Sequence, residues 1–127
     1  MEIVVNINMN IYEQKLITGR FYWDIVPLSP VDSVTYDGLC SIPMEAEISI
    51  ASSLEGERAI DVVLHESLHA MEHMYDMDLP EDTIGKLGCM LSKLFVENEW
   101  LTTYINEQIQ IHKIRTANEG TTVQPLE

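Results

Sequence analysis

Positively charged residues are scarce in this chain of 127 residues. Seven Lys and Arg stand against 21 Asp and Glu, which gives a formal net charge of −14. The acidic excess is not confined to a tail, because residues 1–64 carry 10 acidic and 3 basic side chains and residues 65–127 carry 11 and 4. Nucleic acids and anionic membrane surfaces both attract basic protein surfaces. We therefore expect neither nucleic acid nor membrane as a partner.

Long apolar runs are also missing, and cysteine is rare. No stretch approaches the roughly 20 apolar residues of a membrane-spanning helix, and the first residues lack the basic and apolar regions of a signal peptide. Cys40 and Cys89 lie far apart and form no CxxC pair, so we expect both to be reduced and largely buried. These features predict a single cytoplasmic domain spanning residues 1–127.

Residues 1–54 have the pattern of a small β-sheet. Apolar residues alternate from Ile3 to Met9, and residues 15–26 are rich in aromatic and β-branched side chains around a possible turn at Gly19. Residues Met44–Ala51 alternate most clearly, with small or apolar side chains on one face and polar ones on the other. This pattern predicts a strand with one solvated face at a sheet edge.

Residues 55–115 change to a helical period. We expect a first helix from about Glu57 to Asp76 and a second from Glu81 to Trp100, separated by a break that contains Pro80. The second helix should pack antiparallel to the first through Ile84, Leu87 and Leu91. Residues 101–115 fit either a third helix or a continuation, and residues 116–127 are expected to be a frayed tail. The predicted class is α+β, with the sheet preceding the helices.

The first helix carries an HExxH motif, formed by His65, Glu66 and His69. Residues four apart lie on the same side of a helix, so the two imidazoles can bind one zinc ion. The glutamate after the first histidine then reaches a water on the metal and can accept its proton. The motif predicts a zinc site with His65 and His69 as ligands and Glu66 as general base.

The helical wheel separates this motif from most of the apolar residues of the helix. His65, Glu66 and His69 share an arc with His73 and Asp76, and the opposite arc is mainly apolar. We therefore expect the apolar arc to face the core and the motif to face away from it. His73 and Asp76 are candidates for orienting the ligands.

Residues 62–71, Val-Val-Leu-His-Glu-Ser-Leu-His-Ala-Met, resemble the extended signature of zincin metallopeptidases. With the strand and loop before them, they are similar to minimal zincins of the ImmA/IrrE type and to small phage-encoded metallopeptidases. This resemblance covers roughly residues 36–101. It implies a zincin-like fold, and a host cytoplasm if the chain is phage-encoded. It also implies that an extended peptide substrate pairs with the predicted edge strand Met44–Ala51.

A catalytic zinc ion needs a third protein ligand, and the resemblance suggests where to look for it. The ImmA/IrrE-type proteins resemble gluzincins, which take a glutamate near the start of the next helix in an ExxAxxFA-like pattern. Glu81-x-x-Ile84-x-x-Leu87-Gly88 fits this pattern, which makes Glu81 the preferred ligand. The alternatives are Asp78, Asp82 and Glu97.

The predicted function is therefore a zinc-dependent metallopeptidase, in which a zinc-activated water attacks a peptide bond and Glu66 is the base. Two rivals remain. The chain can be a catalytically silent zincin-like module that keeps the fold, with or without the metal, for interaction or regulation. It can also be a structural helix in which the motif arose by coincidence. An intact glutamate favours the enzyme, because metal binding alone requires no general base.

Overall fold

The computed structural model describes residues 9–41 and 46–121 of the chain. It divides into two compact units, of which the first ends at Ser92 and the second begins at Lys93. The predicted strand from Ile3 to Met9 lies outside the described residues except for Met9, which is not in a strand. Two short 3₁₀ helices, η1 (Ile11–Glu13) and η2 (Asp32–Val34), precede the first and third strands.

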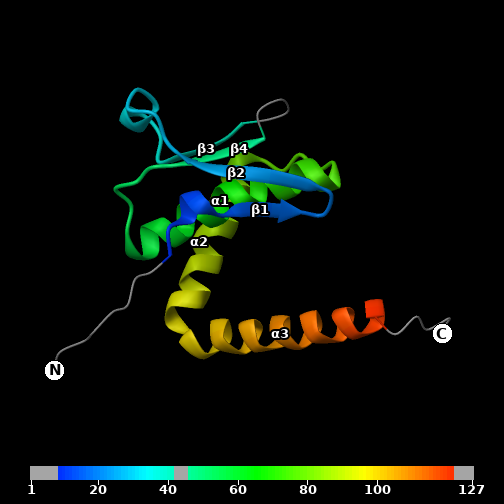
Figure 1. Ribbon diagram of the computed structural model, residues 1–127. Helices are drawn as coiled ribbons and strands as arrows, with labels where there is room; N and C mark the ends of the chain where they lie inside the picture. The colour runs from blue at the N-terminus through cyan, green and yellow to red at the C-terminus, as the bar shows by residue number, and fades with distance from the viewer. Residues whose placement is uncertain (1–8, 42–45, 122–127) are drawn as a thin grey trace. The chain divides into compact units, whose positions relative to one another are not determined.

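Four short strands form one mixed sheet in the first unit (Figure 1). They are β1 (Lys15–Thr18), β2 (Phe21–Pro27), β3 (Gly38–Ser41) and β4 (Glu47–Ile50), in the spatial order β1-β2-β4-β3. The two outer pairs are antiparallel, and β2 pairs with β4 in parallel. The β1–β2 turn falls at Gly19, as predicted, with a φ of 64° that glycine adopts without steric cost.

The prediction that Met44–Ala51 forms an edge strand is wrong for the part that the structure describes. β4 lies inside the sheet, hydrogen-bonded to β2 on one side and to β3 on the other. Alternation reports only that one face of a strand is covered, and it does not show how many neighbours the strand has. The described edges are β1 and β3, while residues 44–45 lie outside the described part.

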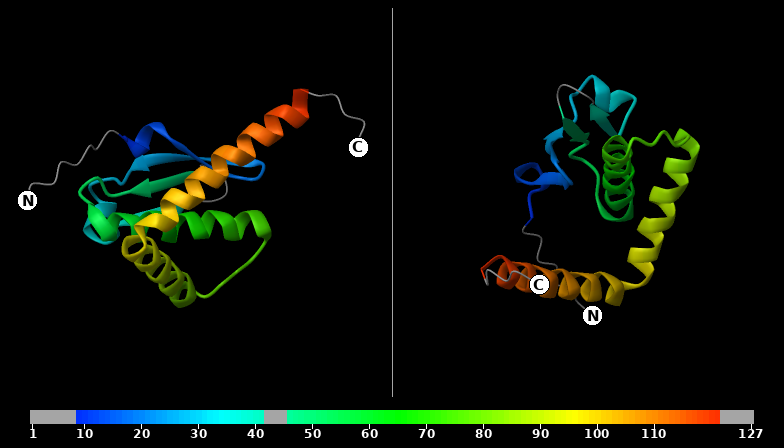
Figure 2. Two further views of the ribbon diagram at one scale, coloured as in Figure 1. Left: turned by 90° about the horizontal axis from the view of Figure 1, so that it is seen from below. Right: turned by 90° about the vertical axis from the view of Figure 1, so that its right-hand side faces the viewer.

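Helix α1 (Gly56–Tyr75) covers one face of the sheet (Figure 2). Its buried residues are Val62, Glu66 and Ala70. Val62 and Ala70 join Trp23, Ile48 and Ile50 of the sheet in one buried cluster. The wheel prediction was therefore wrong about Glu66, which faces the sheet. The reason is that α1 is covered on two sides, by the sheet and by α2, so no single apolar arc defines its buried surface.

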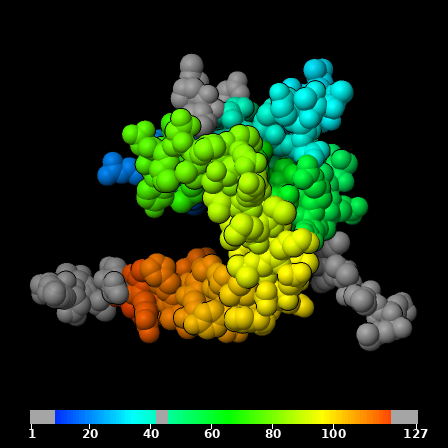
Figure 3. Space-filling view, turned by 180° about the vertical axis from the view of Figure 1, so that it is seen from behind, coloured from blue at the N-terminus to red at the C-terminus, as the bar shows by residue number. Residues whose placement is uncertain are grey.

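Helix α2 (Glu81–Glu97) packs against α1. Figure 3 shows its outer surface. Its buried residues are Ile84, Gly88 and Ser92, whereas the predicted contacts Leu87 and Leu91 are only half-buried. A Cβ on Gly88 would lie 3.0 Å from Asp61 Oδ1 and 3.6 Å from His65 Cα. The two helices therefore approach closely at this glycine.

Helix α3 (Glu99–Thr121) settles the open question about residues 101–115, because α2 ends at Glu97 and a separate helix follows. Between α2 and α3, the Asn98 side chain donates a hydrogen bond to the carbonyl oxygen of Leu94. The helix continues through residues 116–121, so the tail prediction was wrong for that segment. None of the described helices is long and apolar enough to cross a membrane.

Candidate metal centre

The two histidines of the motif project from successive turns of α1 toward one point. His65 Nε2 and His69 Nε2 lie 3.3 Å apart, and the ring centroids are separated by 5.0 Å. Both side chains are partly covered, with exposed fractions of 22% and 25%. The helical spacing of four residues thus brings both ring nitrogens to the same place, as the sequence predicted.

Glu81 reaches this point from the first turn of α2. Its Oε1 lies 2.7 Å from His65 Nε2, and its Oε2 lies 3.0 Å from His69 Nε2. The donor atoms of His65, His69 and Glu81 all lie within 4.8 Å of one another. No other group of three such donors occurs in residues 9–41 and 46–121. The structure therefore brings together the three residues predicted as ligands.

The spacing of these atoms can be compared with that around a metal ion. Zinc bonds of about 2.0–2.2 Å in a tetrahedral arrangement separate neighbouring donor atoms by about 3.3 Å. The two imidazole nitrogens have this separation already. The carboxylate oxygens lie closer than this, with Oε1 2.7 Å from His65 Nε2 and Oε2 3.0 Å from His69 Nε2, as hydrogen-bonded partners do, so the carboxylate would have to move outward to admit an ion. Two imidazoles and one carboxylate therefore fit a metal ion such as zinc.

Glu66 lies beside this cluster, on the side of α1 that faces β3. Only 7% of the residue is exposed. Burial raises the pKa of its carboxyl group, and the nearby charge of Glu81 raises it further, while His65 and His69 act in the opposite direction. A carboxylate with a raised pKa accepts a proton more readily, which suits a general base.

Gly38 allows β3 to pass close to Glu66. A Cβ at this position would lie 2.8 Å from Val62 Cγ1 and 3.0 Å from Glu66 Cγ. Nothing in the sequence indicated this close approach. The glycine is therefore needed for space, because any larger residue would push the strand away from the helix.

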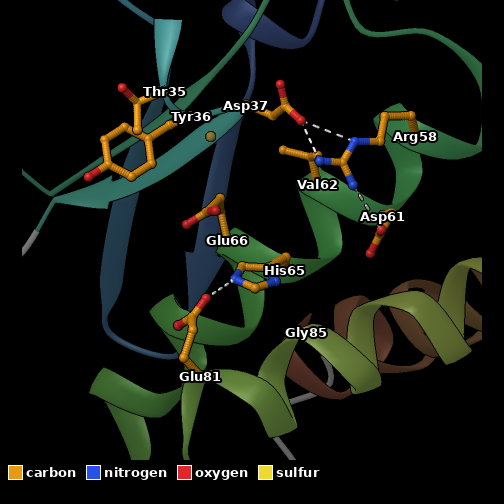
Figure 4. Close-up of a pocket in the computed structure, with 11 residues that line it drawn as sticks. Thr35, Tyr36, Asp37, Arg58, Asp61, Val62, His65, Glu66, Glu81 and Gly85 are labelled. Atoms are coloured by element: carbon orange, nitrogen blue, oxygen red, sulfur yellow. Dashed lines mark hydrogen bonds and ion pairs between the residues drawn. The ribbon is translucent and has the colours of Figure 1, made fainter. Parts of the chain in front are cut away.

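A pocket of about 430 Å³ is lined by Glu66 and by His65 and Glu81 of the cluster (Figure 4). Arg58 closes one end, because its guanidinium donates hydrogen bonds to Asp37 and, at 3.4 Å, to Asp61. In Figure 3 the segment before β3 (cyan) lies beside the start of α1 (green), where the Arg58–Asp37 pair joins them. The sequence gave no signal for these residues. The lining is completed by Thr35, Tyr36, Gly38, Val62, His65, Glu66, Glu81 and Gly85.

His69 has a further partner that the sequence reasoning missed. Its Nδ1 lies 2.9 Å from Oε1 of Glu72, which is three residues further along α1. The predicted orienting residues have other positions: the His73 ring lies against Phe21, and Asp76 is the left-handed residue that ends α1. The i, i+3 spacing of His69 and Glu72 is a helical contact that the sequence could have revealed.

The alternative third ligands lie elsewhere. Asp82 pairs with Lys86 at 3.0 Å, and Asp78 lines a neighbouring hollow of about 280 Å³ next to His69. Glu97 is sixteen residues beyond Glu81, about 24 Å along a helix at 1.5 Å per residue. Among the four predicted candidates, Glu81 is the one whose carboxylate contacts both histidines.

Both cysteines are free, but only one is even partly buried. The expectation that both are largely buried was wrong for Cys89, which is exposed on α2. Cys40 lies on β3, where burial, followed by the negative charges of Glu66 and Glu72, raises the pKa of its thiol to about 12. Cys40 is therefore a thiol rather than a thiolate at neutral pH.

We compared the chain with protein-family models, with curated proteins and with solved structures, and found no match in any of the three.

Proposed function

We propose that this protein is a zinc-dependent peptidase with His65, His69 and Glu81 as metal ligands. The observation that carries the proposal is the convergence of these three donors beside a buried glutamate, at the wall of an open pocket. When bound, zinc would polarise a peptide carbonyl and make a water more acidic. The HExxH spacing and its resemblance to minimal zincins support the same chemistry.

Each of the four proposed site residues has a defined task. His65 and His69 would each offer a ring nitrogen to the metal, and Glu81 would offer a carboxylate oxygen. Glu66 is not needed as a ligand, and its raised pKa suits it to accept a proton from the attacking water. It would then deliver this proton to the nitrogen of the leaving amine, so the peptide bond breaks without a net change in protonation of the protein.

The peptide substrate is proposed to bind along β3 rather than along β4. The resemblance to zincins implies binding to an edge strand, and β4 is an interior strand. β3 is at a described edge of the sheet and approaches Glu66 closely at Gly38. An extended peptide could therefore add to the sheet as a further strand, with its carbonyl groups next to the pocket.

The charge of the pocket limits which peptides are suitable. Four carboxylates line it, from Asp37, Asp61, Glu66 and Glu81, and Arg58 is the only Lys or Arg in the lining. Arg58 is already paired with two of these carboxylates. An acidic peptide would be repelled by this arrangement, so the proposal favours neutral or basic peptides.

The test is the cleavage of a mixed library of neutral, basic and acidic peptides by the zinc-loaded protein and by its Glu66→Gln variant. We expect the variant to bind zinc like the wild type. Its cleavage rate should be lower by about 10²- to 10⁴-fold, the usual contribution of a general base. Mass spectrometry of the products gives the rate, and zinc titration gives the metal content.

Two outcomes would count against the proposal. Equal cleavage by both proteins would reject Glu66 as the base. Zinc binding without cleavage of any peptide would favour the catalytically silent module instead, which keeps the metal for interaction or regulation.

A further inference from the structure

Glu72 is a nearly buried carboxylate with two separate hydrogen-bond partners. Its side chain is 11% exposed. Oε1 lies 2.9 Å from His69 Nδ1, and Oε2 accepts a hydrogen bond of 2.6 Å from the backbone N–H of Leu79. A carboxylate only accepts, so His69 Nδ1 donates the proton in this pair, and the neutral tautomer with that proton has its lone pair on Nε2, the nitrogen that faces Glu81 Oε2 at 3.0 Å. One side chain thus contacts both a predicted ligand and the link that leads to α2.

The position of Glu72 is unfavourable for helix stability alone. It lies in the last turn of α1, where the helix dipole disfavours negative charge. The end of the helix is also completed without its side chain, because Asp76 adopts a left-handed conformation and the N–H of Met77 bonds to the backbone carbonyl of Glu72. These facts point to a role for the carboxylate at the metal centre rather than in capping the helix.

We infer that Glu72 is a positioning residue that couples His69 to Glu81, an inference that rests on the proposed metal site. Leu79 stands two residues before Glu81, so the bond from its N–H fixes the backbone from which Glu81 projects. The Glu81 side chain is 70% exposed and is therefore not held by packing. Glu72 thus fixes the orientation of one ligand and the approach of another.

Glutamine at this position would have the same shape but only one accepting oxygen. It can satisfy either His69 Nδ1–H or the Leu79 N–H, and its amide group then faces the other donor. The Glu72→Gln variant therefore breaks the double contact without opening a cavity. Asp76→Asn is the matched control, since it removes one negative charge from the same hollow and asparagine tolerates the left-handed conformation.

The experiment measures zinc affinity by competition with chromophoric chelators of graded strength, for the wild type and both variants. We expect Glu72→Gln to weaken zinc binding roughly 10–100-fold, the usual cost of losing a residue that orients a ligand. Asp76→Asn should change it by less than about threefold, because it alters only a screened charge. With Co²⁺ in place of zinc, the visible absorption band should change in Glu72→Gln and not in Asp76→Asn. Thermal unfolding of the metal-free proteins shows that each variant is folded.

The coupling has its own test in a protein that lacks Glu81. The cost of Glu72→Gln should be smaller in the Glu81→Ala background than in the wild type, because the approach of Glu81 no longer matters. Equal costs would mean that Glu72 acts on His69 alone and would overturn the coupling. Equal zinc affinities of Glu72→Gln and Asp76→Asn would overturn the inference altogether. A wild type without zinc affinity would instead refute the proposed function itself.

Discussion

Two neighbouring hollows beside α1 have similar side chains and different geometry. The larger one contains His65, Glu66 and Glu81, and the smaller one contains His73, Asp76 and Asp78 next to His69 and Glu72. Each therefore has histidine and carboxylate groups. Only His65, His69 and Glu81, at the boundary between the two hollows, bring three donor atoms within 4.8 Å among the described residues.

The difference between the hollows comes from chain reversal rather than from composition. The link after α1 returns the chain so that the first turn of α2 faces His65 and His69. His73 is two turns beyond His65, and its ring lies 5.3 Å from that of Phe21 and 5.8 Å from that of Trp23. A potential ligand becomes part of a site only when the backbone brings a third donor to it.

The largest expected effect on zinc binding separates His65 and His69, the proposed ligands, from His73 of the smaller hollow. His65→Ala and His69→Ala should each abolish binding of one zinc ion per chain, because two remaining donors hold zinc poorly. His73→Ala is the matched control on the same helix and should bind zinc like the wild type. Elemental analysis of protein purified without chelators or affinity metals measures the content. Zinc retained by both ligand variants, or lost from His73→Ala, would place the metal elsewhere.

A smaller loss of zinc affinity is expected when the candidate carboxylate ligands are substituted. Glu81→Ala should weaken zinc binding by more than the roughly 10–100-fold typical of losing a residue that orients a ligand, because a ligand itself is lost. Asp78→Ala and Glu97→Ala should leave the affinity within about threefold of the wild type, since each changes only a screened charge. Competition titration provides these affinities. A larger loss in Asp78→Ala than in Glu81→Ala would transfer the third ligand to the smaller hollow.

The smallest expected effect is a difference in alkylation rate between the thiols of Cys40 and Cys89. At pH 8 a pKa of about 12 leaves only about one Cys40 in 10,000 as thiolate, and Cys89 is exposed. Iodoacetamide should therefore modify Cys89 at least tenfold faster than Cys40 in the folded protein. Peptide mapping by mass spectrometry follows both sites, and in urea the two rates should converge. Equal rates without urea would show that Cys40 is not shielded beside Glu66.

The sequence predicted the local parts of this molecule well and the nonlocal parts poorly. The turn at Gly19, the start of α2 at Glu81 and the shared direction of His65 and His69 all follow from short-range patterns, and the structure agrees with them. Whether Met44–Ala51 had one or two neighbours depended on strand order, which alternation does not encode. That is why an interior strand was expected to be an edge strand.

The burial of Glu66 could not be predicted for a similar reason. A wheel describes one helix against one apolar surface, but α1 is covered by the sheet on one side and by α2 on another (Figure 2). The bond from the Leu79 N–H to Glu72 also needs the actual path of the link, although the His69–Glu72 spacing was visible in the sequence. The roles of His65, Glu66, His69 and Glu81 in zinc chemistry remain predictions.

All three proposed ligands lie within residues 65–81, a short segment of the chain. Closing a short loop costs little entropy, and contacts between nearby residues form early in folding. The pair formed by α1 and the start of α2 can therefore assemble its donors before the sheet is complete. Metal bound at that stage would favour the helical hairpin over the unfolded chain, so the ion would act during folding as well as in the finished protein.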